Sequence, residues 1–270
     1  MDTLESGTLA LPGARLYFEV RGRGPLLLLV PGGASDAEVF RGLAEELAAR
    51  HRVVTYDPRG ISRSSLDAAP TGPWIDTQAE DAVRLLDHVA PHGEHVRVFG
   101  SCAGGLTTLE LLVRHPQRVR CAVVHEPPAV GLLPDAARHA AFFDEVYAIF
   151  RREGVPAALD RLRDLFGGRA APPLPRAADN DAYFLSHVML PSTRHVPDLT
   201  ALAAVAGRIV MAGGRESRTY DVHRPAAELA RRLGRQLVEF PGGHAGYAKH
   251  PASFARQLEQ LLDDARPVVH

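Results

Sequence analysis

The sequence predicts an α/β fold in which a mostly parallel β-sheet is flanked by helices and carries one helical insertion. Short apolar and β-branched runs, such as Leu26–Val30 and Val119–Val124, alternate with longer segments whose apolar residues recur at helical spacing. Leu26–Val30 is apolar at every position, which is typical of a strand covered on both faces of a parallel sheet. Strands that alternate with helices join through right-handed crossovers, so we expect one sheet.

The chain begins with an expected edge hairpin, residues 7–11 and 14–21, which turns at Pro12-Gly13. After it, the apolar pattern changes repeatedly between strand and helix. In chain order, the expected elements are a strand at 26–30, a helix at 37–50, a strand at 53–56, a helix at 77–88, a strand at 95–99, a helix reaching 113, a strand at 119–124, a strand at 208–212, a helix at 224–233, a strand at 236–240 and a helix at 251–264.

Residues 134–196 differ from the rest and predict a helical cap on a core made of residues 1–133 and 197–270. This segment has no strand pattern, and its apolar residues recur at helical spacing. Such residues either line an apolar pocket or only pack the cap against the core. The cap side chains expected to line such a pocket, and to touch whatever it binds, are Phe142, Phe143, Tyr147 and His187.

Residues 96–113 are typical of a strand, a tight turn and a helix. In the turn Gly100-Ser101-Cys102-Ala103-Gly104, the glycines lie two residues before and two residues after Cys102. The strand and helix backbones approach closely at such a turn, so these flanking positions must be nearly free of side chains. Cys102 is therefore the expected central residue, whereas a turn centred on Ser101 would place Phe99 at a flanking position.

Charge and cysteine content limit the partners. With 31 basic and 32 acidic residues the formal net charge is −1, so the chain lacks the basic excess that nucleic acids or acidic membranes attract. The two cysteines, Cys102 and Cys121, lie in the turn and in the next strand, which favours reduced thiols and a cytoplasmic protein. Residues 1–5 are acidic and unlike a signal peptide, and Leu26–Val30 is too short to span a membrane. We expect no nucleic-acid and no membrane partner.

Three closely spaced histidines, His88, His92 and His95, raise the question of a metal site. Their context, Pro91-His92-Gly93-Glu94, is typical of a solvated loop. No cysteine or pair of carboxylates completes a donor set there. We therefore expect no metal and no cofactor.

The turn around Cys102 resembles the nucleophile elbow Gly-x-Ser-x-Gly of the α/β-hydrolase fold family, with a thiol where most members carry a hydroxyl. Two more segments carry the resemblance. One is Pro31-Gly32-Gly33-Ala34, and the other is the run 57–64, Asp-Pro-Arg-Gly-Ile-Ser-Arg-Ser, which matches a family loop except that Ser62 replaces a glycine. The resemblance covers nearly the whole chain and implies an α/β-hydrolase fold with a cap.

The resemblance also implies a nucleophile, an acid and a histidine in that chain order. Cys102 would be the nucleophile, and His244, in the glycine-rich loop after the last strand, would be the base. Two acids are open. Glu216 lies in the loop where the family usually places its acid and is preferred over Glu126, which follows the preceding strand.

The same resemblance assigns an oxyanion hole to backbone N–H groups of Gly33 and Ala103, with Ala34 as the alternative to Gly33. Ala34 and Ser101 are also expected to touch the substrate. These positions lie in the two loops that follow neighbouring strands of the expected sheet, so they would converge on the carbonyl that the thiol attacks.

A cysteine at the elbow resembles dienelactone hydrolases and thioesterase-like domains, which implies an acyl-cysteine intermediate formed from a small-molecule ester, thioester or lactone. Two other functions fit the same residues. One is a cyclase, lactone-forming enzyme or acyltransferase, and the other is a non-hydrolytic lyase or ligand-binding member of the fold. A cysteine at position 102 is also what would be found if a serine there had been replaced on purpose, in order to trap a complex. The sequence points neither to nor against a carrier protein or a homodimer.

Overall fold

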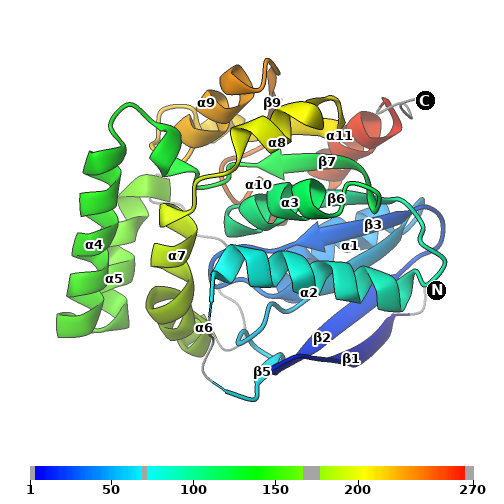
Figure 1. The fold of residues 1–270 in the computed structure, drawn as a ribbon, viewed down its shortest axis with the longest axis horizontal. Coiled ribbons are helices and arrows are strands. Elements are labelled where there is room, and N and C mark those ends of the chain that lie inside the picture. Colours follow the sequence, from blue (N-terminus) through cyan, green and yellow to red (C-terminus); the bar gives the residue numbers. More distant parts are fainter. Residues whose placement is uncertain (1–3, 69–71, 167–176, 265–270) are drawn as a thin grey trace.

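A single mixed β-sheet runs through the protein, and helices cover both of its faces (Figure 1). The computed structural model describes residues 4–68, 72–166 and 177–264. The strands are β1 (Glu5–Leu11), β2 (Ala14–Arg21), β3 (Leu26–Val30), β4 (Arg52–Tyr56), β5 (Ser65–Leu66), β6 (Val96–Ser101), β7 (Val119–His125), β8 (Ile209–Gly214) and β9 (Leu237–Phe240). The edge hairpin expected at the start of the chain is the pair β1 and β2.

The strand order is β1-β2-β4-β3-β6-β7-β8-β9, with β5 pairing beside β2. From β4 to β9 every neighbouring pair is parallel, whereas β2 runs antiparallel to β1, β4 and β5. The predicted mostly parallel sheet is therefore confirmed. Because parallel strands end at one edge, the loops after β3, β6, β7, β8 and β9 meet there.

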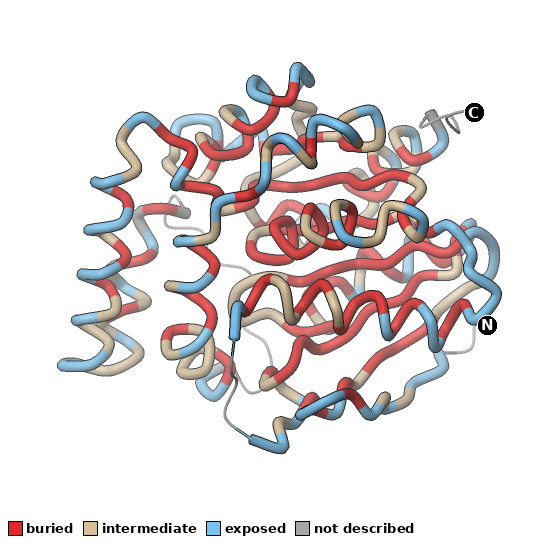
Figure 2. Tube along the Cα trace, viewed as in Figure 1, coloured by how far each residue is buried: buried red, intermediate tan, exposed pale blue. Residues whose placement is uncertain are grey.

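Apolar side chains fill both sides of the sheet. Figure 2 shows that most of the sheet and the inner sides of the helices are buried. Side chains alternate between the faces along β3, since Leu28 and Val30 belong to one core and Leu27 and Leu29 to the other. The helices of the first face are α2 (Trp74–Val89), α3 (Ala103–Arg114), α8 (Leu199–Ala204) and α9 (Arg224–Arg232). Those of the second face are η1 (Ala37–Phe40), α1 (Arg41–Leu47), α10 (Gly246–Lys249) and α11 (Pro251–Asp264).

Between β7 and β8 the described residues form helices and loops, as the sequence predicts for the insertion. They are η2 (Val130–Leu132), α4 (Ala136–Glu153), α5 (Val155–Leu162), η3 (Arg163–Phe166), α6 (Ala177–Tyr183), η4 (Phe184–Val188), α7 (Met189–Arg194), α8 and η5 (Ala206–Arg208). We call α4 to α7 the cap helices. They lie together on one side of the sheet (Figure 1) and enclose an apolar core of their own, which includes Val146, Leu162 and Met189.

None of the helices in residues 4–68, 72–166 and 177–264 is both long and apolar enough to cross a membrane. The longest of the cap helices, α4, carries charged residues along its length, including Arg151 and Arg152 in its last turn.

Candidate active site

Cys102 lies at the tip of the sharp turn between β6 and α3. Its backbone is strained, with φ 55° and ψ −129°, a conformation that few residues other than glycine adopt. A side chain at Gly100 would overlap Thr108 Oγ1, and one at Gly104 would overlap the carbonyl oxygen of Val30. The steric demand that predicts Cys102 as the central residue is therefore present in the structure.

His244 is held between Cys102 and a buried carboxylate. Its Nδ1–H donates to Oε2 of Glu126 over 2.7 Å, and the ring is also hydrogen-bonded to Cys102. Burial by itself lowers the pKa of His244, but the contacts with Cys102 and Glu126 outweigh burial, so the pKa is raised. The ring is thus placed to take a proton from the thiol and to hold it.

Glu126 is fully buried directly after β7 and has a left-handed backbone, with φ 46°. Its Oε1 accepts hydrogen bonds from the backbone N–H of Gly214 (2.8 Å) and from His223 Nδ1–H (3.2 Å). Burial by itself raises the pKa of Glu126. The hydrogen bonds from His223 and His244 lower the pKa by more than burial raises it, so it lies well below its ordinary value. The carboxylate is therefore ionised and fixed by donors on both oxygens.

Glu216, the acid preferred from the sequence, follows β8 in the short helix η6 (Arg215–Ser217) and is exposed. Its backbone N–H donates to the carbonyl of Gly242. The buried carboxylate that receives the His244 Nδ1–H is instead that of Glu126. The geometry therefore favours the alternative acid, because Glu126 is buried and bonded to His244 whereas Glu216 is exposed in η6.

His223 was not predicted from the sequence. Its ring, in the loop before α9, contacts the Glu126 carboxylate, and the residue is 8% exposed. A lone histidine in a loop has no periodic signal. The available hint was the pair Gly213-Gly214 at the end of β8, because glycine inside a strand often marks a close approach by another group.

The loop after β3 lies against the elbow, as an oxyanion hole requires. A Cβ at Gly32 would lie 2.7 Å from the backbone nitrogen of Ala103 and 2.8 Å from Cβ of Cys102. Gly33 follows with φ 64° and lies next to the ring of Phe184 from the cap. The backbone of this loop and the N–H of Ala103 are thus adjacent, and the assignment of Gly33 and Ala103 as donors stays a prediction.

An apolar cavity of about 50 Å³ opens beside Cys102 and Ala103. Cap side chains form much of its wall, among them Phe143, Leu162, Phe184 and Met189. A cavity with apolar walls beside a nucleophile would receive an apolar part of a substrate.

The remaining side chains predicted at the substrate do not line this cavity. Phe142 lines an outer cavity of about 610 Å³, where the guanidinium of Arg161 stacks 4.3 Å from the centre of its ring. His187 is exposed and lines a third cavity, of about 190 Å³. Ala34, Ser101 and Tyr147 are not among the residues that line these three cavities.

Besides Cys102 and His244, Ser101 and His125 form a second contact between a potential nucleophile and a histidine. Oγ of Ser101 and Nδ1 of His125 are 3.5 Å apart, which is long for a hydrogen bond, and both side chains are fully buried. Burial lowers the pKa of His125 to about 4, and its Nε2 is buried without a partner. This neutral ring packs among aromatic rings, including Phe99 and Phe254.

Three side chains near the elbow could in principle hold a metal ion. His125, Glu126 and His244 place ligand atoms within 4.8 Å of one another. Both oxygens of Glu126 and Nδ1 of His244 are already engaged in hydrogen bonds, which a metal ion would have to displace. The donor set fits an acid–histidine pair better than a metal site, and the expectation of no metal and no cofactor stays a prediction.

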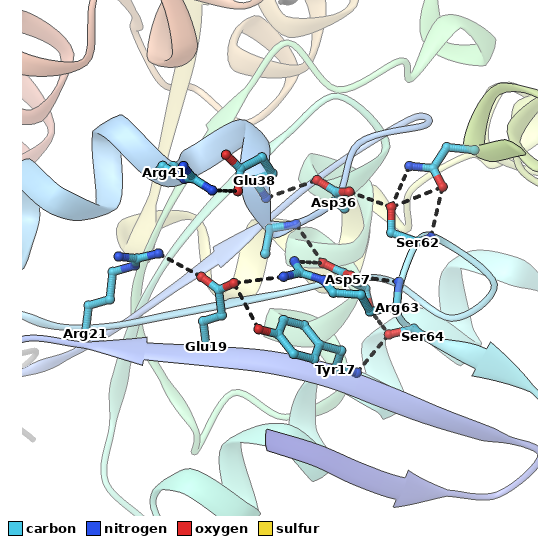
Figure 3. Close-up of polar contacts among 12 residues, drawn as sticks. Tyr17, Glu19, Arg21, Asp36, Glu38, Arg41, Asp57, Ser62, Arg63 and Ser64 are labelled. Carbon is cyan, nitrogen blue, oxygen red and sulfur yellow. Dashed lines mark hydrogen bonds and ion pairs between the residues drawn. The ribbon is translucent and has the colours of Figure 1, made fainter. Parts of the chain in front are cut away.

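The cap is anchored near the loop after β3, which contains Gly33. Asn180 of α6 accepts the backbone N–H of Ser62 (2.9 Å) and donates through Nδ2 to the Ser62 hydroxyl (2.9 Å). That hydroxyl donates to Asp36, which follows the loop containing Gly33 (Figure 3). A partly buried network beside it joins Arg63, Asp57 and Glu19. The replacement of a family glycine by Ser62 therefore has a structural role.

Comparison with known proteins identifies the family. The family described as alpha/beta hydrolase fold matches residues 25–173. The chain belongs to the α/β-hydrolase fold family. This α/β-hydrolase is 36% identical over 266 residues to the uncharacterized hydrolase YraK of Bacillus subtilis (strain 168), with 97% of each chain covered. It is 28% identical over 266 residues to the zearalenone hydrolase of Bionectria ochroleuca, covering 93% of this chain and 95% of that one.

A solved structure of a hydrolase from Pseudomonas aeruginosa PA01 is similar over 95% of this chain and 98% of that one, with a TM-score of 0.69 and 25% identity. The resemblance to the α/β-hydrolase fold is thus confirmed.

Proposed function

We propose that this α/β-hydrolase cleaves an ester, thioester or lactone through an acyl intermediate on Cys102. The observation that carries the proposal is the linked arrangement of Cys102, His244 and Glu126. The thiol lies at a strained turn, its histidine neighbour contacts it, and a buried carboxylate fixes that histidine. A nucleophile, a base and a group that orients the base are the parts that covalent acyl transfer needs.

The acylation step follows from these positions. His244 takes the thiol proton, and Sγ of Cys102 attacks the carbonyl carbon while the carbonyl electrons move to its oxygen. The N–H groups of Gly33 and Ala103 would bind that oxyanion, and losing one such donor costs about 3 kcal/mol of barrier. When the tetrahedral species collapses, the bond to the leaving group breaks, and His244 returns its proton to the departing alcohol or thiol.

Deacylation reverses the roles. Water gives a proton to His244 and attacks the thioester carbon, and the second tetrahedral species releases the carboxylic acid. The thiol regains its proton from His244. Glu126 remains ionised throughout, because its Oε2 accepts from His244 Nδ1–H in both steps and stabilises the imidazolium that forms.

Cys102 is a better nucleophile candidate than Ser101 on two grounds. Cys102 lines the apolar cavity, whereas the side chain of Ser101 is 0% exposed within the end of β6. His244 is linked to a carboxylate, whereas the histidine near Ser101 is His125, whose Nε2 is buried without a partner. Without a carboxylate to fix it, such a histidine lacks the group that orients a base.

The substrate class rests on the cavity walls. Phe143, Leu162 and Met189 surround the space next to Cys102, so the group bound there is apolar and small, and the larger outer cavity would hold the rest of the molecule. The family and the relatives named as hydrolases support transfer of the acyl group to water.

The test is intact-mass spectrometry of the protein after mixing with a panel of small acyl thioesters, esters and lactones. We expect an adduct with the mass of the acyl group in the wild type, none in Cys102→Ala, and an adduct in Ser101→Ala. Product analysis with and without an added alcohol separates hydrolysis from acyl transfer. An adduct that survives in Cys102→Ala but disappears in Ser101→Ala would show that Ser101 is the nucleophile.

A further inference from the structure

His223 contacts the acid of the site yet takes no part in the proton transfers described above. Its Nδ1 lies 3.2 Å from Glu126 Oε1, on the side of the carboxylate away from His244. We propose that His223 is a positioning residue, which holds Glu126 so that Oε2 stays against His244 Nδ1. This rests on the proposed function, because it assigns His223 a role through that acid.

The distribution of donors around Glu126 carries the argument. Oε1 accepts from Gly214 N–H and His223 Nδ1–H, and Oε2 accepts from His244 Nδ1–H. With the Gly214 bond alone, the carboxylate could still rotate about it. A second donor on Oε1 fixes the plane of the carboxylate, and with it the direction from which Oε2 meets His244.

The strand beside the acid makes room for His223. A Cβ at Gly213 would lie 2.6 Å from Cε1 and 2.7 Å from Nδ1 of the His223 ring, closer than real carbon contacts allow. Any other residue at this position of β8 would push the ring away from Glu126. Glycine within a strand weakens the sheet, so its presence here agrees with a need for this close approach.

The next residue ties the His223 loop to the cap. The guanidinium of Arg224 makes two hydrogen bonds to the Asp135 carboxylate, 2.7 and 2.9 Å long, and Asp135 directly precedes α4. Arg224 also donates to Asp221 within the loop (3.1 Å). A partly exposed ion pair contributes little stability by itself, but these contacts fix where the loop presents His223.

Two substitutions separate positioning from simple loss of packing. In His223→Asn the amide N–H can replace Nδ1–H as a donor to Oε1, whereas His223→Leu fills the space and removes the donor. We expect His223→Leu to lower kcat by about 10- to 100-fold, the range for lost supporting contacts, with KM changed less than about twofold. His223→Asn should restore most of kcat. The matched control is His115→Leu, which removes a histidine paired with Glu80 at the C-terminal end of α3, the end away from Cys102.

A spectroscopic measurement tests the same contact without turnover. The Nδ1–H of His244 bound to Glu126 should give a low-field proton NMR signal, assigned by its loss in Glu126→Gln. We expect this signal to shift or broaden in His223→Leu and to return in His223→Asn. Unchanged kcat and an unchanged signal in His223→Leu, or equal losses in both variants, would overturn the proposal. If no substrate acylates Cys102 the proposed function fails, and the NMR comparison still tests the contact.

Discussion

Replacing Glu126 by glutamine changes one atom of the side chain, and the hydrogen bonds around it determine the consequence. A glutamine amide offers one oxygen that accepts and one nitrogen that donates. Two N–H groups, of Gly214 and His223, point at Oε1, and one, of His244, points at Oε2. The amide oxygen therefore takes the Oε1 position, because it satisfies two buried donors there rather than one.

That orientation places the amide NH₂ against Nδ1 of His244. Nδ1 must then accept a hydrogen bond, so the ring proton moves to Nε2, the nitrogen that has to receive the thiol proton from Cys102. A histidine in the wrong tautomer in a triad lowers kcat about 10⁴-fold, which corresponds to ~5 kcal/mol of barrier. Folding should survive, because the amide keeps the size of the carboxylate and an acceptor for both Oε1 donors.

The assay compares kcat/KM of the wild type, Glu126→Gln and Glu216→Gln on an activated ester or thioester that acylates the protein, with thermal unfolding of each variant as the check on folding. Glu216 is exposed, so its variant should retain activity within about twofold, as surface substitutions usually do. A crippled Glu216→Gln beside an active Glu126→Gln would refute the assignment of the acid.

Three other outcomes follow from the described contacts. Phe143→Ala should enlarge the cavity beside the thiol and raise kcat/KM for longer acyl groups, relative to shorter ones, by about tenfold. The same variant should lower the unfolding free energy by about 3–5 kcal/mol. Phe142→Ala should leave the ratio of kcat/KM values unchanged, and a series of substrates of increasing acyl length measures the ratio for both variants. Asn180→Ala should speed proteolysis of the cap and lower the unfolding free energy by about 1–2 kcal/mol. Ser62→Gly should lower it by less, because glycine loses the side-chain contacts but relieves a left-handed backbone. Equal losses in the two variants would contradict this reasoning. Because the pKa of Glu126 is lowered in the folded protein, its stabilising effect is present above the ordinary value of 4.5 and is lost as the pH falls further, so urea unfolding of the wild type and Glu126→Gln should converge in acid.

The elbow was predictable because a local steric rule determines it. Gly100 and Gly104 flank Cys102 in the sequence, and the structure shows that side chains at both positions would overlap neighbouring atoms. The sheet was predictable for a similar reason, since runs such as Leu26–Val30 can be satisfied only by burial on both faces. Both inferences need only residues that are adjacent along the chain.

The carboxylate that contacts His244 was harder to predict, because the choice depends on how loops turn after neighbouring strands. Glu126 and Glu216 follow β7 and β8, which pair in parallel, so both begin at the same sheet edge. Sequence order does not reveal that one carboxylate turns into the protein while the other turns toward solvent. His223 was not predicted because its contact with Glu126 joins residues 97 positions apart. The contact also depends on residue 213 being a glycine, which has no side chain to displace the ring.

Among the described residues, the non-glycine positions with positive φ are Ser62, Cys102 and Glu126. Such a backbone costs about 1–3 kcal/mol at each position and persists only where its surroundings hold it. Donors fix Glu126, the elbow glycines fix Cys102, and Asp36 with the cap residue Asn180 fixes Ser62. Two of these positions belong to the proposed triad, and the third joins the cap to the loop before Asp36. The strain therefore lies at the proposed nucleophile, at the proposed acid and at the contact that joins the cap to the loop before Asp36. A variant that relaxes the backbone at one of these positions should loosen the alignment of these three parts.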